Sequence, residues 1–269
     1  MPEGHVIHRL ADTLTATFAG RPVRVSSPQG RFADEAARLD ARDLVLAEAW
    51  GKHLFVTFDV PEPAVVQIHL GLIGKLMIGP DRAPWGQVRL RITDGVTAAD
   101  LRGPQTCRLI GLEQQAAEIA KLGPDPLRAD ADPDRGWAVV QRSTKSIAAL
   151  LMDQKVAAGV GNIYRAEVLY RHRLEPFTPG NRIAHETWLA MWADFVTLMH
   201  DGVDSGRVDT VTAEHTPEAM DRPPRVDRHG GEVYVYRRAG QPCHVCGTEV
   251  RTELLAGRNL YWCPTCQVL

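Results

Sequence analysis

A glycine-bearing junction between two expected helices is the most informative segment of this sequence: Asp153-Gln154-Lys155-Val156-Ala157-Ala158-Gly159-Val160-Gly161-Asn162-Ile163-Tyr164. Gly159 and Gly161 permit tight backbone turns, and Asn162 then stands where a helix N-cap belongs. A turn of this kind points backbone N–H groups and the positive end of the helix dipole outward, which suits a phosphate. Taken alone, however, the segment favours an ordinary helical hairpin capped by Asn162.

The surrounding chain changes from strand-like to helical patterns. Residues 3–18 have helical spacing with a stop at Gly20, whereas residues 21–112 show alternation typical of an antiparallel sandwich or barrel. Apolar residues then recur at helical spacing in three places: Ile147, Leu150 and Leu151; Ile163, Ala166 and Leu169; and Trp188, Met191 or Trp192, Phe195 and Leu198. Residues 201–230 are polar and lack periodicity, which predicts a long loop.

Four cysteines near the C-terminus form two close pairs, Cys243 with Cys246 and Cys263 with Cys266. The arrangement is C-x2-C, sixteen residues, then C-x2-C, which can place four thiolates around one tetrahedral Zn²⁺. Four protein ligands leave no open position, so the predicted zinc is structural. Disulfides or a redox C-x-x-C are the alternatives, but a chain without a signal peptide disfavours disulfides, and one redox pair leaves the other unexplained.

These patterns together predict a multidomain α+β protein. Residues 1–122 form an N-terminal helix plus an antiparallel β-sandwich, and 123–136 form a linker of Gly, Pro and acidic residues. Residues 137–234 form a helix-two-turn-helix domain, and 235–269 form a four-cysteine zinc-finger hairpin.

Charge and targeting signals narrow the class of protein. The formal net charge is −2, but residues 142–182 carry seven Lys or Arg against three acids. A nucleic-acid-binding protein needs a basic face rather than a basic total, although such runs are also common on ordinary surfaces. No apolar run is long enough to span a bilayer and no signal peptide is recognisable, so we expect a cytoplasmic protein with no membrane partner.

Several motifs in register carry a resemblance to a known family. They are Pro2-Glu3-Gly4, Gly51-Lys52, the junction quoted above, and the finger with its entry Val235-Tyr236-Arg237-Arg238. In this order they closely resemble the formamidopyrimidine-DNA glycosylase/endonuclease VIII family of base excision repair, over essentially the whole chain. His5 resembles an actinobacterial group of endonuclease VIII-type enzymes within that family.

The resemblance implies a chemistry for the N-terminus. In the family Met1 is removed and the amine of Pro2 attacks C1′ of the damaged nucleotide; free α-amines titrate near about 8, so an unprotonated fraction exists at neutral pH. The resulting imine permits strand cleavage by β,δ-elimination. Glu3 would transfer protons and Lys52 would reach a phosphate beside the lesion. A helix that merely starts with Pro-Glu, and a solvated turn lysine, are the plain alternatives.

The same resemblance also implies which residues contact DNA. Asn162, Arg258 and, less directly, Lys155 would bind phosphates, and Leu72 would fill the gap that a flipped nucleotide leaves, unless Leu72 is a core residue. The formamidopyrimidine branch has an Arg-Phe pair for the orphaned base, whereas this chain reads Asp100-Leu101-Arg102-Gly103-Pro104-Gln105-Thr106. The loop of residues 201–230 also lacks the pattern of that branch's capping loop. These departures favour oxidised pyrimidines over 8-oxoguanine.

We therefore expect a bifunctional DNA glycosylase and abasic-site lyase with one structural zinc. Its partner is double-stranded DNA with oxidised bases or abasic sites, with single-stranded or bubble DNA left open, and the protein is expected to be a monomer associated with the nucleoid through DNA. The alternatives are the same chemistry on 8-oxoguanine or formamidopyrimidine, a non-catalytic damaged-DNA binding protein, and a plain zinc-ribbon interaction protein.

Overall fold

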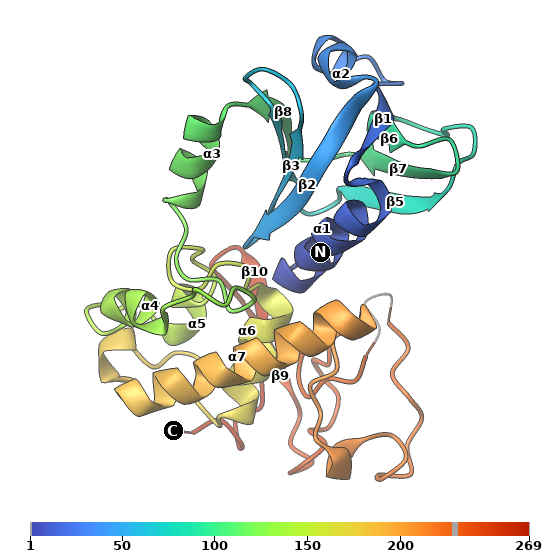
Figure 1. The fold of residues 1–269 in the computed structure, drawn as a ribbon. Coiled ribbons are helices and arrows are strands. Elements are labelled where there is room, and N and C mark those ends of the chain that lie inside the picture. The colour runs from blue at the N-terminus through green and yellow to red at the C-terminus, as the bar shows by residue number, and fades with distance from the viewer. Residues whose placement is uncertain (1, 228–230, 269) are drawn as a thin grey trace. The chain divides into compact units, whose positions relative to one another are not determined.

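A computed structural model describes residues 2–227 and 231–268, and the chain divides into two compact units (Figure 1). Unit 1 ends at Lys121 and unit 2 begins at Leu122. The first unit is built mainly of β-strands and the second mainly of helices, with a C-terminal hairpin. This confirms the predicted fold class, whereas the finer division of unit 2 into linker, helical domain and finger stays a prediction.

Unit 1 consists of an N-terminal helix packed on antiparallel strands. Helix α1 (Gly4–Phe18) buries a stripe formed by Ile7, Ala11, Leu14 and Phe18, which recur at helical spacing. The strands follow in the order β5-β7-β6-β1-β2-β3-β4-β8, and all their pairings are antiparallel. Their bounds are β1 Arg21–Ser26, β2 Arg42–Trp50, β3 His53–Phe58, β4 Val65–His69, β5 Lys75–Pro80, β6 Val88–Thr93, β7 Thr97–Arg102 and β8 Thr106–Ile110.

Strand β1 joins two layers of this sheet. Its first half pairs with β2 and its second half pairs with β6, so the chain passes from one layer to the other within six residues. Buried apolar side chains of both layers then form one core with α1. Two short helices complete the unit, α2 (Ala33–Leu39) and α3 (Leu112–Ile119). Helix α2 departs from the strand-like pattern expected for 21–112; its Ala-rich sequence buries Ala36 and Leu39.

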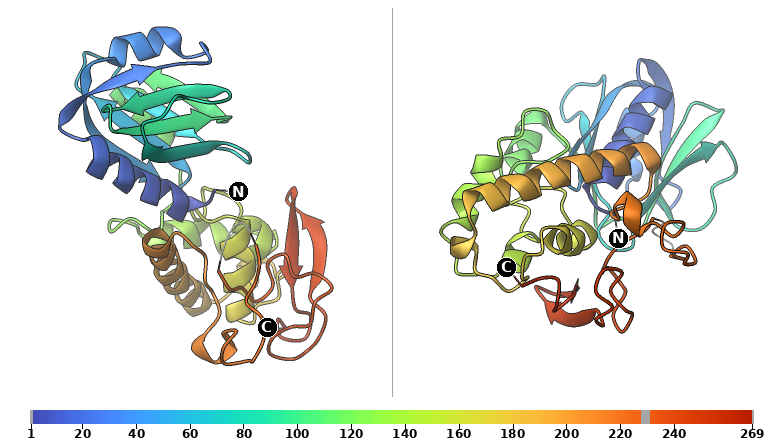
Figure 2. Two further views of the ribbon diagram at one scale, coloured as in Figure 1. Left: turned by 90° about the vertical axis from the view of Figure 1, so that its right-hand side faces the viewer. Right: turned by 90° about the horizontal axis from the view of Figure 1, so that it is seen from below.

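Unit 2 is organised around a buried helix. Its elements are α4 (Pro133–Val140), α5 (Ile147–Leu150), α6 (Asn162–Arg171), the 3-10 turns η1 (Gly180–Arg182) and η2 (Ala213–His215), α7 (His185–Ser205), and strands β9 (Arg251–Leu255) and β10 (Arg258–Trp262). Every residue of α6 from 162 to 170 is buried, with α7 and β10 beside it (Figure 2). The three helices predicted from apolar spacing are therefore confirmed.

Two boundaries differ from the predicted ones. Helix α7 continues to Ser205 and ends at Gly206, whose φ of +72° is the left-handed conformation that favours glycine at a helix C-terminus, so the loop starts later than 201. Helix α4 begins at Pro133, inside the predicted linker, because Asp132 caps it and Pro133 takes its first turn. Residues 228–230 of the predicted loop lie outside the described residues. No helix in the described ranges is long and apolar enough to cross a membrane.

Candidate active site, phosphate-binding elements and metal centre

The two N-terminal candidates lie at the start of α1. Glu3 is the N-cap residue, with extended backbone dihedrals, and its side chain is completely buried. A buried carboxylate requires polar partners, since burying an isolated charge is costly. Pro2 directly precedes it and is partly exposed. The fold thus fixes Glu3 tightly and holds the backbone nitrogen of Pro2 one residue away from a buried acid.

Lys52 occupies the two-residue turn between β2 and β3, as predicted. Trp50 pairs with His53 across this turn, and Gly51 has a φ of +59°, which glycine tolerates without strain. His53 faces His69 on β4, with ring centroids 5.0 Å apart. Burial lowers the pKa of His69, and the charge of Lys52 lowers it further, which places the lysine ammonium within electrostatic reach of that imidazole.

A hydrogen-bond relay fixes the state of His53. Arg108 can only donate, and its Nε donates to Gln67 Oε1 over 2.6 Å. The Gln67 amide nitrogen therefore points to His53 Nδ1, 3.2 Å away, which must accept. Burial together with His69 lowers the pKa of His53 to about 4. His53, which follows Lys52, is thus a neutral imidazole with its proton on Nε2. Sequence reasoning missed these three hydrogen-bonded residues because they lie on three different strands, β3, β4 and β8.

Leu72 lies in a tight turn after β4 and is not a core residue. Its side chain is 56% exposed and that of Ile73 is 82% exposed. Gly74 N donates to Leu70 O, and a Cβ on Gly74 would lie 2.2 Å from that oxygen, so the turn requires glycine there. The exposed position removes the alternative that Leu72 packs in the core.

The junction between α5 and α6 is held by Gln154. Its amide donates to Val160 O over 3.0 Å and accepts from Gly159 N over 3.0 Å, while Gly159 has a φ of +88°. Lys155 is exposed on this junction, and its backbone N–H donates to Asp153 Oδ1. The hydrogen bonds of Gln154 therefore hold the predicted glycine turn together, and Lys155 is exposed beside it.

Asn162 does not cap α6 as predicted. Gly161 is the N-cap residue and Asn162 is the first helical residue, because its side chain is engaged elsewhere. Asn162 Nδ2 donates to Asn259 O over 2.9 Å, and Asn162 Oδ1 accepts from the buried Arg165 guanidinium. Arg165 itself is fully buried, and its hydrogen bond to Oδ1 orients the Asn162 amide.

Arg258 begins β10, immediately after the turn of the C-terminal hairpin. Leu255 pairs with Arg258, and the two turn residues, Ala256 and Gly257, have φ values of +52° and +71°, typical of a type I′ turn. Asn259 follows Arg258 in the strand and is the residue that accepts from Asn162. Two of the three phosphate-binding candidates of unit 2, Asn162 and Arg258, thus belong to elements that are joined by hydrogen bonds from α6 to the carbonyl of Asn259.

Glu167 ties the finger entry to α6 and was missed by sequence reasoning. This fully buried carboxylate accepts hydrogen bonds from the backbone N–H groups of Tyr234, Val235 and Tyr236, at 2.7, 2.9 and 2.7 Å. It also accepts from the hydroxyl of Thr210 over 2.6 Å. Four donors converge on one side chain, so the position of the segment before the finger depends on Glu167.

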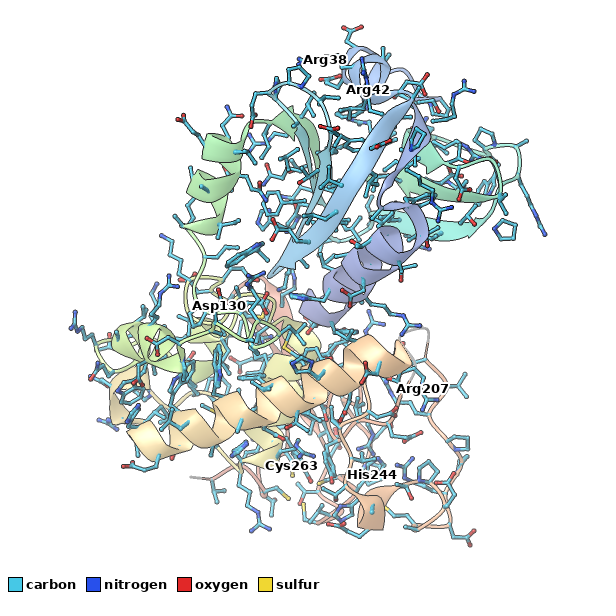
Figure 3. All side chains as sticks on the ribbon, viewed as in Figure 1. Arg38, Arg42, Asp130, Arg207, His244 and Cys263 are labelled. Atoms are coloured by element: carbon cyan, nitrogen blue, oxygen red, sulfur yellow. The ribbon has the colours of Figure 1, made fainter. Side chains whose placement is uncertain are left out.

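The four cysteines form one cluster. The Sγ atoms of Cys243, Cys246, Cys263 and Cys266 all lie within 4.8 Å of one another. Two of these separations, 3.8 Å for Cys243 with Cys266 and 3.4 Å for Cys246 with Cys263, match the roughly 3.8 Å between ligands of a tetrahedral zinc with Zn–S bonds of about 2.3 Å. Cys263 and the neighbouring His244 are labelled in Figure 3. The cluster therefore fits one Zn²⁺ held by four thiolates.

Loss of this zinc should disorder the C-terminal hairpin without unfolding unit 1. The change Cys263→Ser removes a fully buried ligand and should lower the zinc content from one per chain to near zero. Without the metal, the finger lacks its stabilising centre, and the affinity for abasic-site DNA that the sequence resemblance implies should fall at least roughly tenfold as the hairpin with Arg258 disorders. Elemental analysis and fluorescence anisotropy measure the two effects. Cys107→Ser, which lies outside the cluster, is the matched control; a zinc-free variant with unchanged affinity contradicts the prediction.

Comparison with known proteins places the chain in a family. Sequence models match for the formamidopyrimidine-DNA glycosylase N-terminal domain over residues 1–107, the H2TH domain of the same enzyme over 122–214, and the zinc finger found in FPG and IleRS over 240–268. Endonuclease 8 1 of Mycobacterium tuberculosis (strain ATCC 25618 / H37Rv) is 49% identical over 99% of this chain and 100% of its own length. The chain belongs to the formamidopyrimidine-DNA glycosylase/endonuclease VIII family.

Solved structures of family members share the fold. The MutM (Fpg) protein of Thermus thermophilus superposes with a TM-score of 0.75 at 26% identity, covering 99% of this chain and 98% of that one. The Lactococcus lactis Fpg in complex with abasic-site DNA gives 0.79 at 21% identity, covering 98% and 99%. As a member of this family, the chain is a DNA glycosylase and abasic-site lyase of base excision repair that binds DNA and contains one structural zinc.

Proposed function

We propose that this family member removes oxidised bases, with oxidised pyrimidines favoured, through a Schiff base on Pro2. After removal of Met1, the nitrogen of Pro2 attacks C1′ while the bond from C1′ to the base breaks and the base leaves. The nitrogen loses its proton and the sugar ring opens to give a charged imine, which acidifies the 2′ hydrogen. Elimination then expels the phosphate on the 3′ side and afterwards the one on the 5′ side. The observation that carries this proposal is the placement of Pro2 beside the buried Glu3 at the start of α1.

The remaining site residues take roles that their positions support. Glu3 moves the protons at the ring oxygen and at the imine, because its carboxyl group is the buried acid next to the nucleophile. Lys52 binds a phosphate beside the lesion from its hairpin turn. Asn162 and Arg258 bind phosphates from α6 and β10, with Lys155 as an outer contact, and Leu72 fills the space that the displaced nucleotide leaves.

Arg258→Ala should weaken binding to abasic-site DNA roughly tenfold at about 0.1 M salt. Each phosphate contact releases about one counterion from the DNA, and the variant forms one contact fewer. The slope of log K against log salt concentration should become shallower by about one. Anisotropy titrations from about 50 to 200 mM salt measure both. Arg251→Ala is the matched control, since Arg251 is an exposed arginine at the far end of the same hairpin. An unchanged slope would remove Arg258 from the interface.

Two observations support the preference for oxidised pyrimidines: the sequence of one turn in unit 1, and the relative at 49% identity, which carries the name endonuclease 8 1. The turn between β7 and β8 consists of Gly103, Pro104 and Gln105, so it lacks the Arg-Phe pair by which the formamidopyrimidine branch contacts the orphaned base. Single-turnover excision from duplexes with thymine glycol or 8-oxoguanine tests this preference. Faster release of thymine glycol is expected; faster release of 8-oxoguanine selects the same chemistry on purines.

The rest of the proposal concerns the oligomeric state and domain boundaries of the protein and whether its DNA substrate is double- or single-stranded. We expect a cytoplasmic monomer that acts on double-stranded DNA, with domains over 1–122, 137–234 and 235–269 and a linker at 123–136 that includes the first residues of α4. Comparing duplex, single-stranded and bubble substrates with one lesion tests the strand preference. A chain that keeps Met1 would have a blocked nucleophile and would act only as a damaged-DNA binding protein; intact mass distinguishes the two forms.

A further inference from the structure

Trp85 is the only exposed Phe, Tyr or Trp side chain in residues 2–227 and 231–268, with 70% of its surface open. It lies on the connection from β5 to β6, between Pro84 and Gly86. An apolar ring of this size is usually buried when it serves only the fold, because each fully buried aromatic side chain stabilises a protein by about 1.5–3 kcal/mol. An exposed ring indicates a binding surface only where other exposed apolar side chains lie beside it.

The ring is held in place by Arg102 beneath it. The Arg102 guanidinium carbon lies 4.0 Å from the ring centroid, a cation–π contact that covers one face and leaves the other open. Arg102 is anchored in turn, since its Nη2 donates to Asp100 Oδ2 over 3.3 Å, and the same carboxylate accepts from the buried Arg91 over 2.8 Å. Trp85 thus rests on an ion-paired platform built on β6 and β7.

This platform lies at the end of the sheet that carries the turn with Leu72. Arg102 pairs with Lys75, the first residue of β5, and the turn with Leu72 and Ile73 directly precedes it (Figure 1). The carbonyl of Gly103 would lie 3.0 Å from a Cβ on Gly74, so the end of β7 backs against this turn. Three exposed apolar side chains, Leu72, Ile73 and Trp85, therefore share one end of unit 1, beside the exposed charge of Lys75.

We infer that the open face of Trp85 is a stacking site for an unpaired nucleobase, namely the base opposite the nucleotide that Leu72 displaces. The inference rests on the proposed role of Leu72. Displacing a nucleotide leaves its partner base without a pair, and an aromatic ring accepts any base because every base has a π-face. The cationic platform adds attraction to the ring system above it and to nearby phosphates. Stacking of one base on one ring changes affinity roughly 5- to 100-fold.

Fluorescence of 2-aminopurine tests the stacking directly. The probe is placed opposite a tetrahydrofuran abasic analogue, and in a second duplex three pairs away. Wild-type protein should quench the probe opposite the analogue, and Trp85→Leu should lose that quenching and bind at least roughly fivefold more weakly. Trp85→Phe should keep most of both. Val96→Ala is the matched control, because Val96 is 76% exposed at the other end of the same strands. Equal quenching and affinity in Trp85→Leu overturn the inference.

A measurement on the wild-type protein covers the case in which Trp85→Leu fails to fold. 5-Iodouracil opposite the abasic analogue forms a photo-crosslink to a stacked aromatic ring, and peptide mapping should locate it at Trp85. A crosslink at another residue overturns the inference. Borohydride trapping on abasic-site DNA is run in parallel. Trapping at Pro2 without contact at Trp85 refutes only the stacking site, whereas absence of trapping refutes the proposed function and leaves the crosslink to decide the stacking site.

Discussion

Replacing Pro2 with glycine is expected to slow base removal at least about 100-fold while lesion-DNA affinity changes less than about threefold. Glycine keeps an α-amine, but a primary one, without the ring that holds the nitrogen in one orientation next to the buried Glu3. A residue that acts only on the reacting atoms lowers the rate of the chemical step and spares binding made through phosphates. The pattern expected is thus a loss in the single-turnover rate with an almost unchanged Kd.

Intact mass must first show that Met1 is absent from both proteins, because a retained methionine would block either amine. Single-turnover excision of thymine glycol and anisotropy on abasic-analogue DNA then give the rate and the Kd. Lys52→Ala is an informative companion variant, since loss of a phosphate contact should weaken binding and reduce the salt slope. A Pro2→Gly enzyme as fast as wild type would mean that another amine attacks C1′.

Glu167→Gln is expected to lower the free energy of unfolding of unit 2 by about 3 kcal/mol. Glu167 accepts from three consecutive backbone N–H groups and from the Thr210 hydroxyl. A glutamine of the same shape has one acceptor oxygen, so its NH2 group would face donors and leave buried N–H groups without an acceptor. Because these N–H groups lie in the segment that leads into the zinc finger, DNA affinity should also fall.

Urea unfolding of the zinc-loaded protein, followed by circular dichroism, measures the change. Glu175→Gln is the matched control, because Glu175 is an exposed acid a short distance further along the chain and should change stability by less than about 0.5 kcal/mol. Stability equal to wild type in Glu167→Gln would show that water or a shifted backbone satisfies these donors.

Local patterns were sufficient to predict the elements that depend on neighbouring residues. The cysteine spacing predicts the metal cluster, apolar spacing predicts α6 and α7, and Gly51-Lys52 predicts the hairpin turn, since each is specified within a few residues. The N-cap prediction for Asn162 failed because a contact 97 residues away competes for its side chain. The local preference of asparagine for the N-cap is overridden here, because the side-chain amide of Asn162 is hydrogen-bonded to a buried arginine and to a distant carbonyl.

The residues that sequence reasoning missed are those whose contacts are with residues distant in the sequence. Glu167 reads as an ordinary helical acid until α6 is buried and the segment at 234–236 is brought to it. Trp85 and Arg102 come together only through the register that pairs β7 with β5 and β6. Neither juxtaposition has a signature in residue spacing, so the sequence alone could not indicate them.

The proposed mechanism requires that the Pro2 amine forms the covalent intermediate. Borohydride reduction of wild-type protein on an abasic-site duplex, followed by proteolysis and mass spectrometry of the crosslinked peptide, tests it most directly. We expect a DNA adduct on the nitrogen of Pro2 in the N-terminal peptide. An adduct on a lysine such as Lys52, or no adduct from protein whose Met1 has been removed, would contradict it.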